Sequence, residues 1–395
     1  MERTALQLDP VIPGASKLPA LRVALCHYWF NGYGGGERVV EAIAEIFPQA
    51  HFFSLIAGES HALPAVRGRL TTSFVDRIPG AARWHRHFLP LYPFALEQFD
   101  FSDFDLVISS ESGPAKGIIT SPQTCHICYC HSPMRYIWDM YHQSRKSMNP
   151  LTRAIFSATA HYMRLWDVST AARVDYFAAN SRYVAGRIRK YYRRESTVIH
   201  PPVNVSSGYI APNVEDYYLV VSRFVPYKRV EVTIEACNRL RRRLRIVGDG
   251  PEYKALRNLA GPTVEFLGRL DESALHEIYA HCRALLFPGE EDFGIVPVEA
   301  QSHGRPVIAY GRGGALETVT ADLSDGDDPA SRTGVFFLEP TADSLCDAIQ
   351  RFERIESRFR PRFIRNSVER FSLERFKGEF ATFVLDKMGE FSEVT

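Results

Sequence analysis

The sequence has no run of apolar residues long enough to cross a membrane. A spanning helix needs about 18 or more consecutive apolar residues, and no stretch of the chain approaches that length. The segment before Leu21 also lacks the continuous apolar core of a signal peptide. We therefore expect residues 1–20 to be a flexible leader, and any membrane contact to be peripheral.

The sequence also has almost no excess of one charge over the other, because its formal net charge is +1 over 395 residues. Such a balance produces no strong field that would attract nucleic acid, so we expect no nucleic-acid partner. The hydrophobic content of 45% and the charged content of 24% are those of a soluble globular protein. The length allows two domains of ordinary size.

Cysteine is too sparse for a disulfide scaffold, and most of the seven cysteines lie in apolar runs, which suits reduced thiols and a cytoplasmic location. Cys125, Cys128, Cys130 and His131 are close enough in sequence to suggest zinc ligands. A structural zinc site of this kind needs a second pair of ligands at defined spacing, and the next cysteine is Cys237. We interpret these cysteines as small residues of a buried strand.

The common cofactor motifs are also missing. Residues 27–37 form a glycine-rich loop between a predicted strand at 21–26 and a predicted helix at 38–47. The loop fits neither the Gly-x-Gly-x-x-Gly of a dinucleotide site nor a P-loop, which disfavours an oxidoreductase, and it is either a ligand-binding turn or a purely structural one. Asp103 and Asp105 precede an apolar strand, whereas a metal-binding Asp-x-Asp pair should follow one. We therefore expect no metal and no cofactor.

What the sequence does contain is an alternation of short apolar runs with helical patterns, which is typical of an α/β protein with parallel sheets. A linker rich in proline, serine and asparagine at 201–216 divides the alternation into two halves. Short helices are predicted within 60–100, and further helices at 183–194, at 275–279 and after Thr341. The predicted strands lie at 21–26, 51–56, 105–110, 124–131, 175–180, 197–200, 217–222, 244–248, 264–268, 284–287 and 306–309.

His131 falls at the end of its predicted strand, at the edge where open α/β sheets bind ligands. It is either a site residue or a hydrogen-bonded structural histidine. The stretch that follows, residues 135–172, is rich in aromatic and basic side chains. Such a stretch could meet an acceptor or an anionic membrane surface, although a pair of surface helices is the simpler interpretation.

The most distinctive stretch is Phe287–Ala300, in which a strand is followed by a glycine turn, a helix start and two glutamates, Glu291 and Glu299. This order predicts a phosphate-binding crossover flanked by carboxylates that can hold sugar hydroxyls. Arg223 and Lys228 follow another strand, where they either neutralise a diphosphate or remain solvated. The two glutamates could also be a glycosidase pair, but the glycine-rich phosphate sites would then be unexplained.

Residues 291–299 resemble the Glu-x7-Glu motif of retaining glycosyltransferases of the GT-B fold, family four. The whole arrangement of motifs, including residues 129–139, is similar to bacterial mannosyltransferases of the WbaZ type, which act in O-antigen and exopolysaccharide assembly. The resemblance implies two Rossmann-like domains facing across a cleft. It also extends to Gly34–Arg38, Arg223 with Lys228, Val247–Pro251 and Phe266–Arg269.

The resemblance also implies the domain bounds: an acceptor-binding domain at 21–205, a nucleotide-sugar-binding domain at 206–370, and a last helix at 371–395 that packs back on the first domain. It assigns Glu291 to a hydroxyl of the donor sugar and Glu299 to the ribose. Residues implied at the donor are Gly35, Gly36, Arg223, Lys228, Gly268, Arg269, Glu291, Phe293, Gly294, Ile295 and Glu299; those implied in catalysis are His131, Glu291, Arg223 and Lys228; those on the acceptor side are Arg135, Tyr136 and Trp138.

The resulting prediction is a metal-independent, retaining hexosyltransferase. It would move mannose from GDP-mannose onto a lipid-linked oligosaccharide in surface polysaccharide assembly, at the cytoplasmic face of the membrane. Two alternatives stay open at this point. The same chemistry could use a UDP-sugar, or the chain could be a nucleotide-sugar-binding protein that has lost catalysis.

Overall fold

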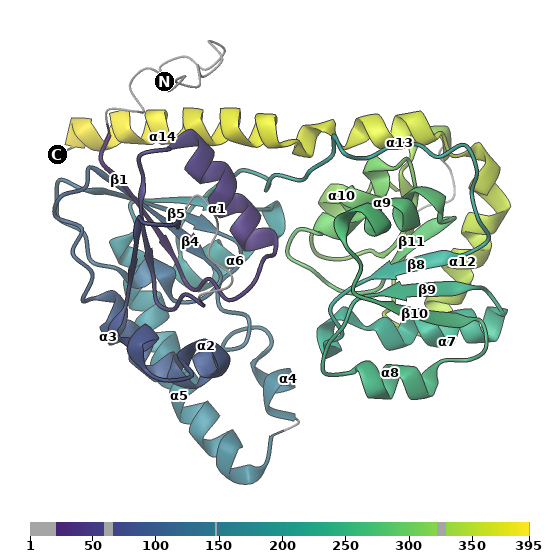
Figure 1. Ribbon diagram of the computed structural model, residues 1–395, viewed down its shortest axis with the longest axis horizontal. Helices are drawn as coiled ribbons and strands as arrows, with labels where there is room; N and C mark the ends of the chain where they lie inside the picture. Colours follow the sequence, from purple (N-terminus) through teal and green to yellow (C-terminus); the bar gives the residue numbers. More distant parts are fainter. Residues whose placement is uncertain (1–20, 59–65, 147, 322–328, 395) are drawn as a thin grey trace. The chain divides into compact units, whose positions relative to one another are not determined.

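The computed structural model describes residues 21–58, 66–146, 148–321 and 329–394, and it comprises two compact units (Figure 1). The first unit is Met1–Pro202 together with Glu374–Thr395, and the second is Val203–Leu373. The leader predicted at residues 1–20 lies outside the described residues. Each unit is built around one sheet in which every described pair of neighbouring strands is parallel.

The sheet of the first unit has seven strands in the order β3-β2-β1-β4-β5-β6-β7. Every residue of the central strands β4 and β5 is buried, because helices cover both faces of the sheet, and this explains their nearly continuous runs of apolar and small residues. The strands are β1 (Val23–His27), β2 (His51–Ser54), β3 (Leu70–Thr72), β4 (Leu106–Glu111), β5 (Cys125–Cys130), β6 (Tyr176–Ala179) and β7 (Thr197–Val198).

Helix α1 of the first unit begins at Gly35, three residues before the predicted start. The Glu37 carboxylate accepts a hydrogen bond of 3.0 Å from the Gly34 N–H, and this cap offsets the poor helix propensity of Gly35 and Gly36. The helices of this unit are α1 (Gly35–Ile46), η3 (Phe74–Arg77), α2 (Ala81–Trp84), η4 (His85–Leu91), α3 (Tyr92–Leu96), η5 (Ala115–Gly117), α4 (Tyr141–Lys146), α5 (Pro150–Thr170), η6 (Ala171–Arg173), α6 (Arg182–Tyr192) and α14 (Leu373–Val394).

Helix α14 brings the end of the chain to the sheet of the first unit. The rings of Phe376 and Phe380 lie 5.8 and 5.9 Å from the ring of Tyr129 in β5. Lys377 forms an ion pair of 2.9 Å with Glu45 of α1. Since both phenylalanines are fully buried, apolar packing holds this helix in place and the ion pair adds little.

The sheet of the second unit has the order β10-β9-β8-β11-β12-β13. Its strands are β8 (Tyr218–Val221), β9 (Leu244–Val247), β10 (Val264–Gly268), β11 (Ala284–Phe287), β12 (Val307–Tyr310) and β13 (Gly334–Phe337). Its helices are η7 (Pro226–Lys228), α7 (Val230–Leu240), α8 (Tyr253–Leu259), α9 (Glu272–His281), α10 (Ile295–Ser302), α11 (Ala315–Thr318), η8 (Pro329–Ser331), α12 (Ala342–Ile355), η9 (Glu356–Arg358), α13 (Pro361–Ser367) and η10 (Glu369–Phe371).

These two sheets confirm the predicted α/β class, but the sequence analysis missed two edge strands. Strand β3 has only three residues. Strand β13 begins at Gly334, where a side chain would come within 2.0 Å of the Val307 carbonyl oxygen, so the glycine is needed for close strand approach although its propensity disfavours a strand. Helix α9 is longer than predicted because Asp271 caps it, accepting a hydrogen bond of 2.8 Å from the Ala274 N–H.

Candidate active site

Most of the residues predicted at the donor lie in the second unit, in loops that follow its parallel strands or at the start of a helix after such a loop. The carboxyl ends of parallel strands meet at one edge of a sheet, and this is the edge where α/β proteins bind ligands. The loop after β8 carries Arg223 and Lys228, and the loop after β11 carries Glu291 and Gly294.

Lys228 and Glu291 form an ion pair at this edge, between the ammonium Nζ and the carboxylate Oε1. Their side chains are only 16% and 19% exposed. Burial by itself lowers the pKa of Lys228, but Glu291 together with Tyr227 and Asp292 outweighs burial, so the pKa is raised and the ammonium stays charged. A side chain at Gly289 would come within 3.1 Å of the Lys228 Cα, so this glycine lets the two loops approach each other.

The loop after β11 is hydrogen-bonded to the loop after β12 and packs closely against it. The Gly314 N–H donates a hydrogen bond of 2.8 Å to the Glu291 carbonyl, and a side chain at Gly314 would come within 2.3 Å of the Phe293 Cα. Gly294 has a φ of 94°, in the left-handed region that favours glycine, and it caps helix α10. The backbone amides of Gly294 and Ile295 thus stand at a helix N-terminus, where anions are favoured.

Two predicted residues in this stretch are fixed by their own contacts. The Phe293 ring is buried against the Phe371 ring, 5.3 Å away, so a ligand could meet only its backbone. The Glu299 carboxylate projects from α10 and accepts a hydrogen bond of 3.0 Å from the Tyr279 hydroxyl of α9. This bond orients the carboxylate that was predicted to hold the ribose.

Three other predicted donor residues lie at the ends of β8 and β10. The Arg223 side chain is exposed. The Gly268 carbonyl accepts a hydrogen bond of 2.7 Å from the Gly248 N–H and ends β10, with a φ of 70° at Gly268. Arg269 is 82% exposed and lies 3.7 Å from Asp249, too exposed and too distant for a strong ion pair. These two arginines are therefore available to a ligand of this edge.

In the first unit the structure brings His131 to the glycine loop. The His131 Nε2 lies 2.9 Å from the Ser110 Oγ, and the same oxygen lies 3.0 Å from the His27 Nδ1. A side chain at Gly36 would come within 3.8 Å of the His131 Nε2 and 3.0 Å of the Tyr28 hydroxyl. Three strand ends and the first turn of α1 thus meet at the carboxyl edge of this sheet.

The electrostatics at His131 keep its ring neutral. Burial, followed by the nearby His27, lowers the pKa of His131 to about 3. The His27 Nε2 lies 3.8 Å from the Glu37 Oε1, so the hydrogen-bonded chain runs from His131 through Ser110 and His27 toward an acidic residue of α1. A neutral imidazole can donate or accept a hydrogen bond but carries no positive charge to a ligand.

Family models match nearly all of the region that carries these two groups of residues. The model described as Glycosyltransferase Family 4 matches residues 33–207, and the model described as Glycosyl transferases group 1 matches residues 209–370. The chain belongs to the family-four glycosyltransferases. The predicted family is therefore confirmed, and both the Gly34–Gly36 part of the glycine loop and the Glu291–Glu299 stretch lie within the matched regions.

Curated relatives of this glycosyltransferase share low identity with it. An uncharacterized glycosyltransferase of Methanocaldococcus jannaschii is 32% identical over 35% of the chain and 41% of its own length. The human alpha-1,3/1,6-mannosyltransferase ALG2 is 25% identical over 68% of each chain. A GDP-mannose-dependent alpha-(1-6)-phosphatidylinositol monomannoside mannosyltransferase of Mycolicibacterium smegmatis is 30% identical over 38% of the chain and 48% of its own length. The chain thus spans less than half the length of the first and third of these relatives.

A solved structure supports the GT-B fold. HepE of Anabaena aligns with a TM-score of 0.67 over 93% of this chain and 100% of its own, at 17% identity. The predicted α/β GT-B fold is therefore confirmed for the glycosyltransferase.

Trp138, one of the residues predicted on the acceptor side, is held by a buried polar network in the first unit. Lys116 contacts the Asp167 carboxylate, and Asp167 also accepts a hydrogen bond of 2.7 Å from the Trp138 indole N–H. Glu111 lies 3.9 Å from Lys116, and burial raises the Glu111 pKa to about 8. The Trp138 indole N–H thus already has its partner, and one face of the ring stacks on the Tyr191 ring, 4.6 Å away.

The other two acceptor-side residues, Arg135 and Tyr136, have partners outside this network. The Arg135 side chain donates to Asp139 over 3.3 Å, and the Tyr136 hydroxyl donates to the Met134 sulfur over 3.1 Å. Both side chains are half-buried. Their roles toward an acceptor stay predictions.

The structure shows where several residues considered as metal ligands lie. Asp105 accepts hydrogen bonds of 2.9 and 2.6 Å from the backbone and guanidinium of Arg22. Cys125, Cys128 and Cys130 are free and buried in β5. Among the described residues no group of three or more histidine, cysteine or acidic side chains is placed to hold a metal ion. Metal independence stays a prediction that only an assay can test.

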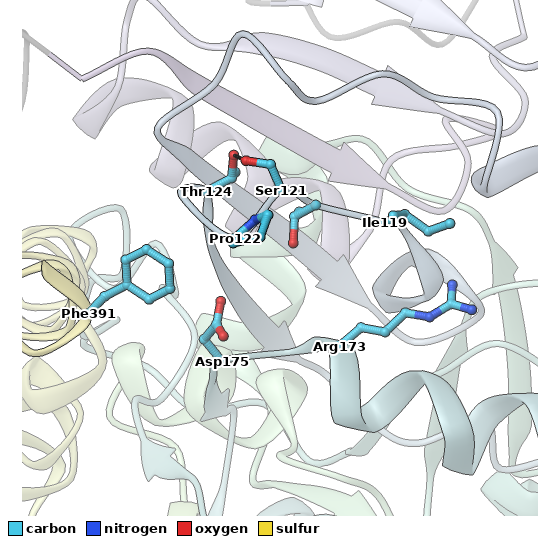
Figure 2. Close-up of a pocket in the computed structure, with 8 residues that line it drawn as sticks. Ile119, Ser121, Pro122, Thr124, Arg173, Asp175 and Phe391 are labelled. Carbon is cyan, nitrogen blue, oxygen red and sulfur yellow. Dashed lines mark hydrogen bonds between the residues drawn. The ribbon is translucent and has the colours of Figure 1, made fainter. Parts of the chain in front are cut away.

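A hollow of about 410 Å³ in the first unit lies away from the His131 edge, near the start of β5 (Figure 2). Thr124, Asp175 and Phe391 are among its lining residues. The Asp175 carboxylate, which Figure 2 shows facing the hollow, already accepts a hydrogen bond of 2.8 Å from the His126 N–H. The hollow is open and its carboxylate has a structural role, so it does not compete with the loop edges as a site.

Three residues important to these sites were missed by the sequence analysis: His27, Ser110 and Tyr279. His27 and Ser110 lie at or next to the carboxyl ends of β1 and β4, a position that could have singled them out. Tyr279 lies in a helix and reaches Glu299 across 20 positions of sequence. No local pattern reveals such a contact.

Proposed function

We propose that this glycosyltransferase moves mannose from GDP-mannose onto a lipid-linked oligosaccharide, with retention of configuration, in surface polysaccharide assembly at the cytoplasmic membrane face. The names of the human and mycobacterial relatives support mannose as the sugar, and the mycobacterial name supports both GDP-mannose and a lipid acceptor. The polysaccharide role rests on the resemblance of the whole arrangement of motifs, residues 129–139 included, to WbaZ-type enzymes.

The observation that carries the proposal is the charged, largely buried Lys228 ammonium held by Glu291 at the ligand-binding edge of the second unit. Breaking the bond between a sugar and a nucleoside diphosphate places negative charge on the diphosphate as it leaves. A fixed ammonium, a guanidinium and helix N-terminal amides can stabilise that charge, as oxyanion-binding groups do. In this proposal Lys228 and Arg223 take the diphosphate, and the amides of Gly294 and Ile295 add to them.

In this proposal the carboxylates of Glu291 and Glu299 bind hydroxyl groups of the donor and do not attack the anomeric carbon of its sugar. Glu299 holds the ribose in the orientation that Tyr279 sets, and Glu291 divides its two oxygens between Lys228 and a hydroxyl of the donor sugar. His131, kept neutral, hydrogen-bonds the transferred sugar and does not deliver a charge. The diphosphate oxygen itself takes the proton of the attacking acceptor hydroxyl in a front-face reaction.

A donor screen tests this proposal. The protein is incubated with GDP-mannose, GDP-glucose, UDP-glucose or UDP-N-acetylglucosamine and a lipid-linked oligosaccharide mixture, and release of each nucleoside diphosphate is measured. We expect release with GDP-mannose and a new α-linked mannose on the acceptor. Turnover only with a UDP-sugar would replace the donor assignment. Tight binding of GDP-mannose without turnover on any acceptor would favour a binding protein instead.

A further inference from the structure

Helix α5 of the first unit carries an apolar face that its own unit leaves exposed. Leu151, Ile155 and Leu165 are 73%, 60% and 63% exposed, and Tyr162 is 46% exposed. Together with the exposed Ala158, they recur at intervals of three and four residues, so they lie along one face of the helix. We call Leu151, Ile155, Ala158, Tyr162 and Leu165 the α5 stripe.

The α5 stripe is separate from the face by which α5 packs on its unit. The packed face consists of other residues, which are buried: Ala160, Met163, Trp166, Asp167 and Thr170. Packing inside the unit therefore explains that face and does not explain the stripe. Figure 1 shows the beginning of α5, together with α4, extending beyond the sheet of the first unit.

The segment that contains the α5 stripe carries charge of one sign. From Met140 to Trp166 the sequence contains four basic residues, Arg145, Lys146, Arg153 and Arg164, and no aspartate or glutamate. The two bordering acids are engaged elsewhere: Asp139 pairs with Arg187 at 2.9 Å, and Asp167 pairs with the buried Lys116. The chain as a whole is nearly neutral, so this stretch is a local concentration of positive charge.

Residues 77–96, which include helix η4 beside α5, also combine exposed apolar side chains with basic residues. Helix η4 packs against α5 and against α2 and α3. From residue 77 to residue 96 the sequence has three arginines and again no acidic residue. Within it Trp84, Leu91 and Phe94 are exposed, as are Arg83 and Arg86.

We propose that the α5 stripe, with the exposed Lys146 and Arg153 and the neighbouring 77–96 segment, docks the first unit onto an anionic lipid bilayer. Exposed aliphatic and aromatic side chains enter the headgroup region of a membrane, and basic residues beside them are attracted to anionic lipids. A second copy of the chain would meet the same positive charge, so charge complementarity favours the bilayer over self-association. The inference rests on the proposed function, because a lipid-linked acceptor lies in such a surface.

Co-sedimentation with vesicles tests the docking surface. The full chain is mixed with vesicles of phosphatidylcholine alone or of phosphatidylcholine with phosphatidylglycerol, in the absence of donor and acceptor. We expect binding to the anionic vesicles only. Replacing Lys146 and Arg153 by glutamate should weaken binding by on the order of fivefold or more for each charge lost. Leu151→Ser with Ile155→Ser should weaken it by about tenfold or more.

Matched controls use exposed residues of the second unit. Leu338→Ser removes a side chain that is 57% exposed, and Arg362→Glu reverses an exposed charge; both should bind vesicles as the wild type does. All variants should keep the wild-type melting temperature, since the replaced side chains pack against little of the unit. A melting temperature that falls with the stripe substitutions would assign the stripe to packing and overturn the proposal.

Other outcomes also decide against the bilayer. Equal binding to neutral and anionic vesicles would contradict the role of charge, and unchanged binding by the stripe variants would contradict the surface. A concentration-dependent dimer, seen by sedimentation without vesicles and lost in Leu151→Ser with Ile155→Ser, would assign the stripe to self-association. Vesicle binding needs no turnover, so the two tests are independent. Absence of vesicle binding would not change the result of the donor screen, and a negative donor screen would not contradict the docking surface.

Discussion

The imidazole of His131 is held by the hydroxyl of Ser110, whose Oγ lies 2.9 Å from the His131 Nε2. The same hydroxyl lies 3.0 Å from the His27 Nδ1, so one serine of β4 connects two histidines at the ends of the strands on either side of it, β1 and β5. A ring fixed in this way loses little freedom when a ligand hydrogen-bonds to it. Ser110 is therefore a positioning residue for His131.

Ser110→Ala should lower kcat by about tenfold, the scale of losing one buried hydrogen bond at a site, with little change in donor KM. Ser109→Ala is the matched control, because Ser109 lies next to Ser110 in β4 and its Oγ lies 2.9 Å from the Nε2 of a different histidine, His126. Steady-state kinetics and melting temperatures of both variants distinguish a positioning role of Ser110 from an effect on stability. Equal losses of activity in the two would mean that Ser110 acts through stability alone.

Lys228→Ala should lower kcat by on the order of a hundredfold or more, as expected for removing one group that stabilises developing charge. It also leaves the Glu291 carboxylate without its ammonium, which adds to the loss. Lys228→Arg replaces the ammonium by a planar guanidinium with the same positive charge and should retain more activity than the alanine variant. Lys254→Ala, at an exposed position of α8, is the control. Wild-type turnover in Lys228→Ala would remove this residue from the site.

The sequence was informative where a residue's role depends on its neighbours along the chain. Runs such as Ala284–Phe287 predicted strands because buried parallel strands read as apolar runs, and the Glu291–Glu299 stretch predicted a ligand edge because a strand, a glycine turn and a helix follow one another there. The family resemblance then added roles that spacing alone could not supply.

The sequence was uninformative where a role depends on a distant partner. The Lys116–Asp167 pair joins positions far apart in the chain, and each of the two looks like an ordinary surface charge until the fold buries it. The same holds for the Tyr279 hydroxyl on Glu299. The glycine loop shows a local limit as well, because helix α1 starts within glycines that propensity would exclude from a helix.

Tyr279→Phe should raise the KM for the donor by about tenfold and change kcat less, because it removes a hydrogen bond to a charged group that orients Glu299 in both the ground and the transition state. Tyr217→Phe is the matched control. Its hydroxyl donates to the Ile278 carbonyl over 2.8 Å, away from the glutamates. A larger effect on kcat than on KM would show that Glu299 acts mainly in the transition state.

Glu111→Gln should change how stability depends on pH. Burial raises the Glu111 pKa to about 8 from its ordinary value of 4.5, so the folded carboxyl keeps a proton that the unfolded chain releases above pH 4.5. Folding therefore takes up a proton between pH 4.5 and 8, and this group makes the protein less stable as pH rises through that window. The fall in melting temperature from pH 6.5 to 8 should be smaller in Glu111→Gln than in the wild type. Glu265→Gln, at an exposed carboxylate, should leave the fall unchanged, and an identical fall in all three proteins would contradict the assignment.

If Lys228 and Arg223 stabilise the leaving diphosphate, EDTA should leave transferase activity intact. A divalent cation performs the same task in enzymes that use one, by neutralising the charge that develops on the phosphates. We therefore also expect that adding Mg²⁺ or Mn²⁺ will not restore turnover to Lys228→Ala, because no carboxylate cluster among the described residues is placed to hold the ion. Initial rates with and without EDTA, for the wild type and for Lys228→Ala with each metal, measure both effects. Loss of wild-type activity in EDTA, restored by one of these metals, would show that the charge on the diphosphate is shared with a cation and that the two basic side chains are insufficient.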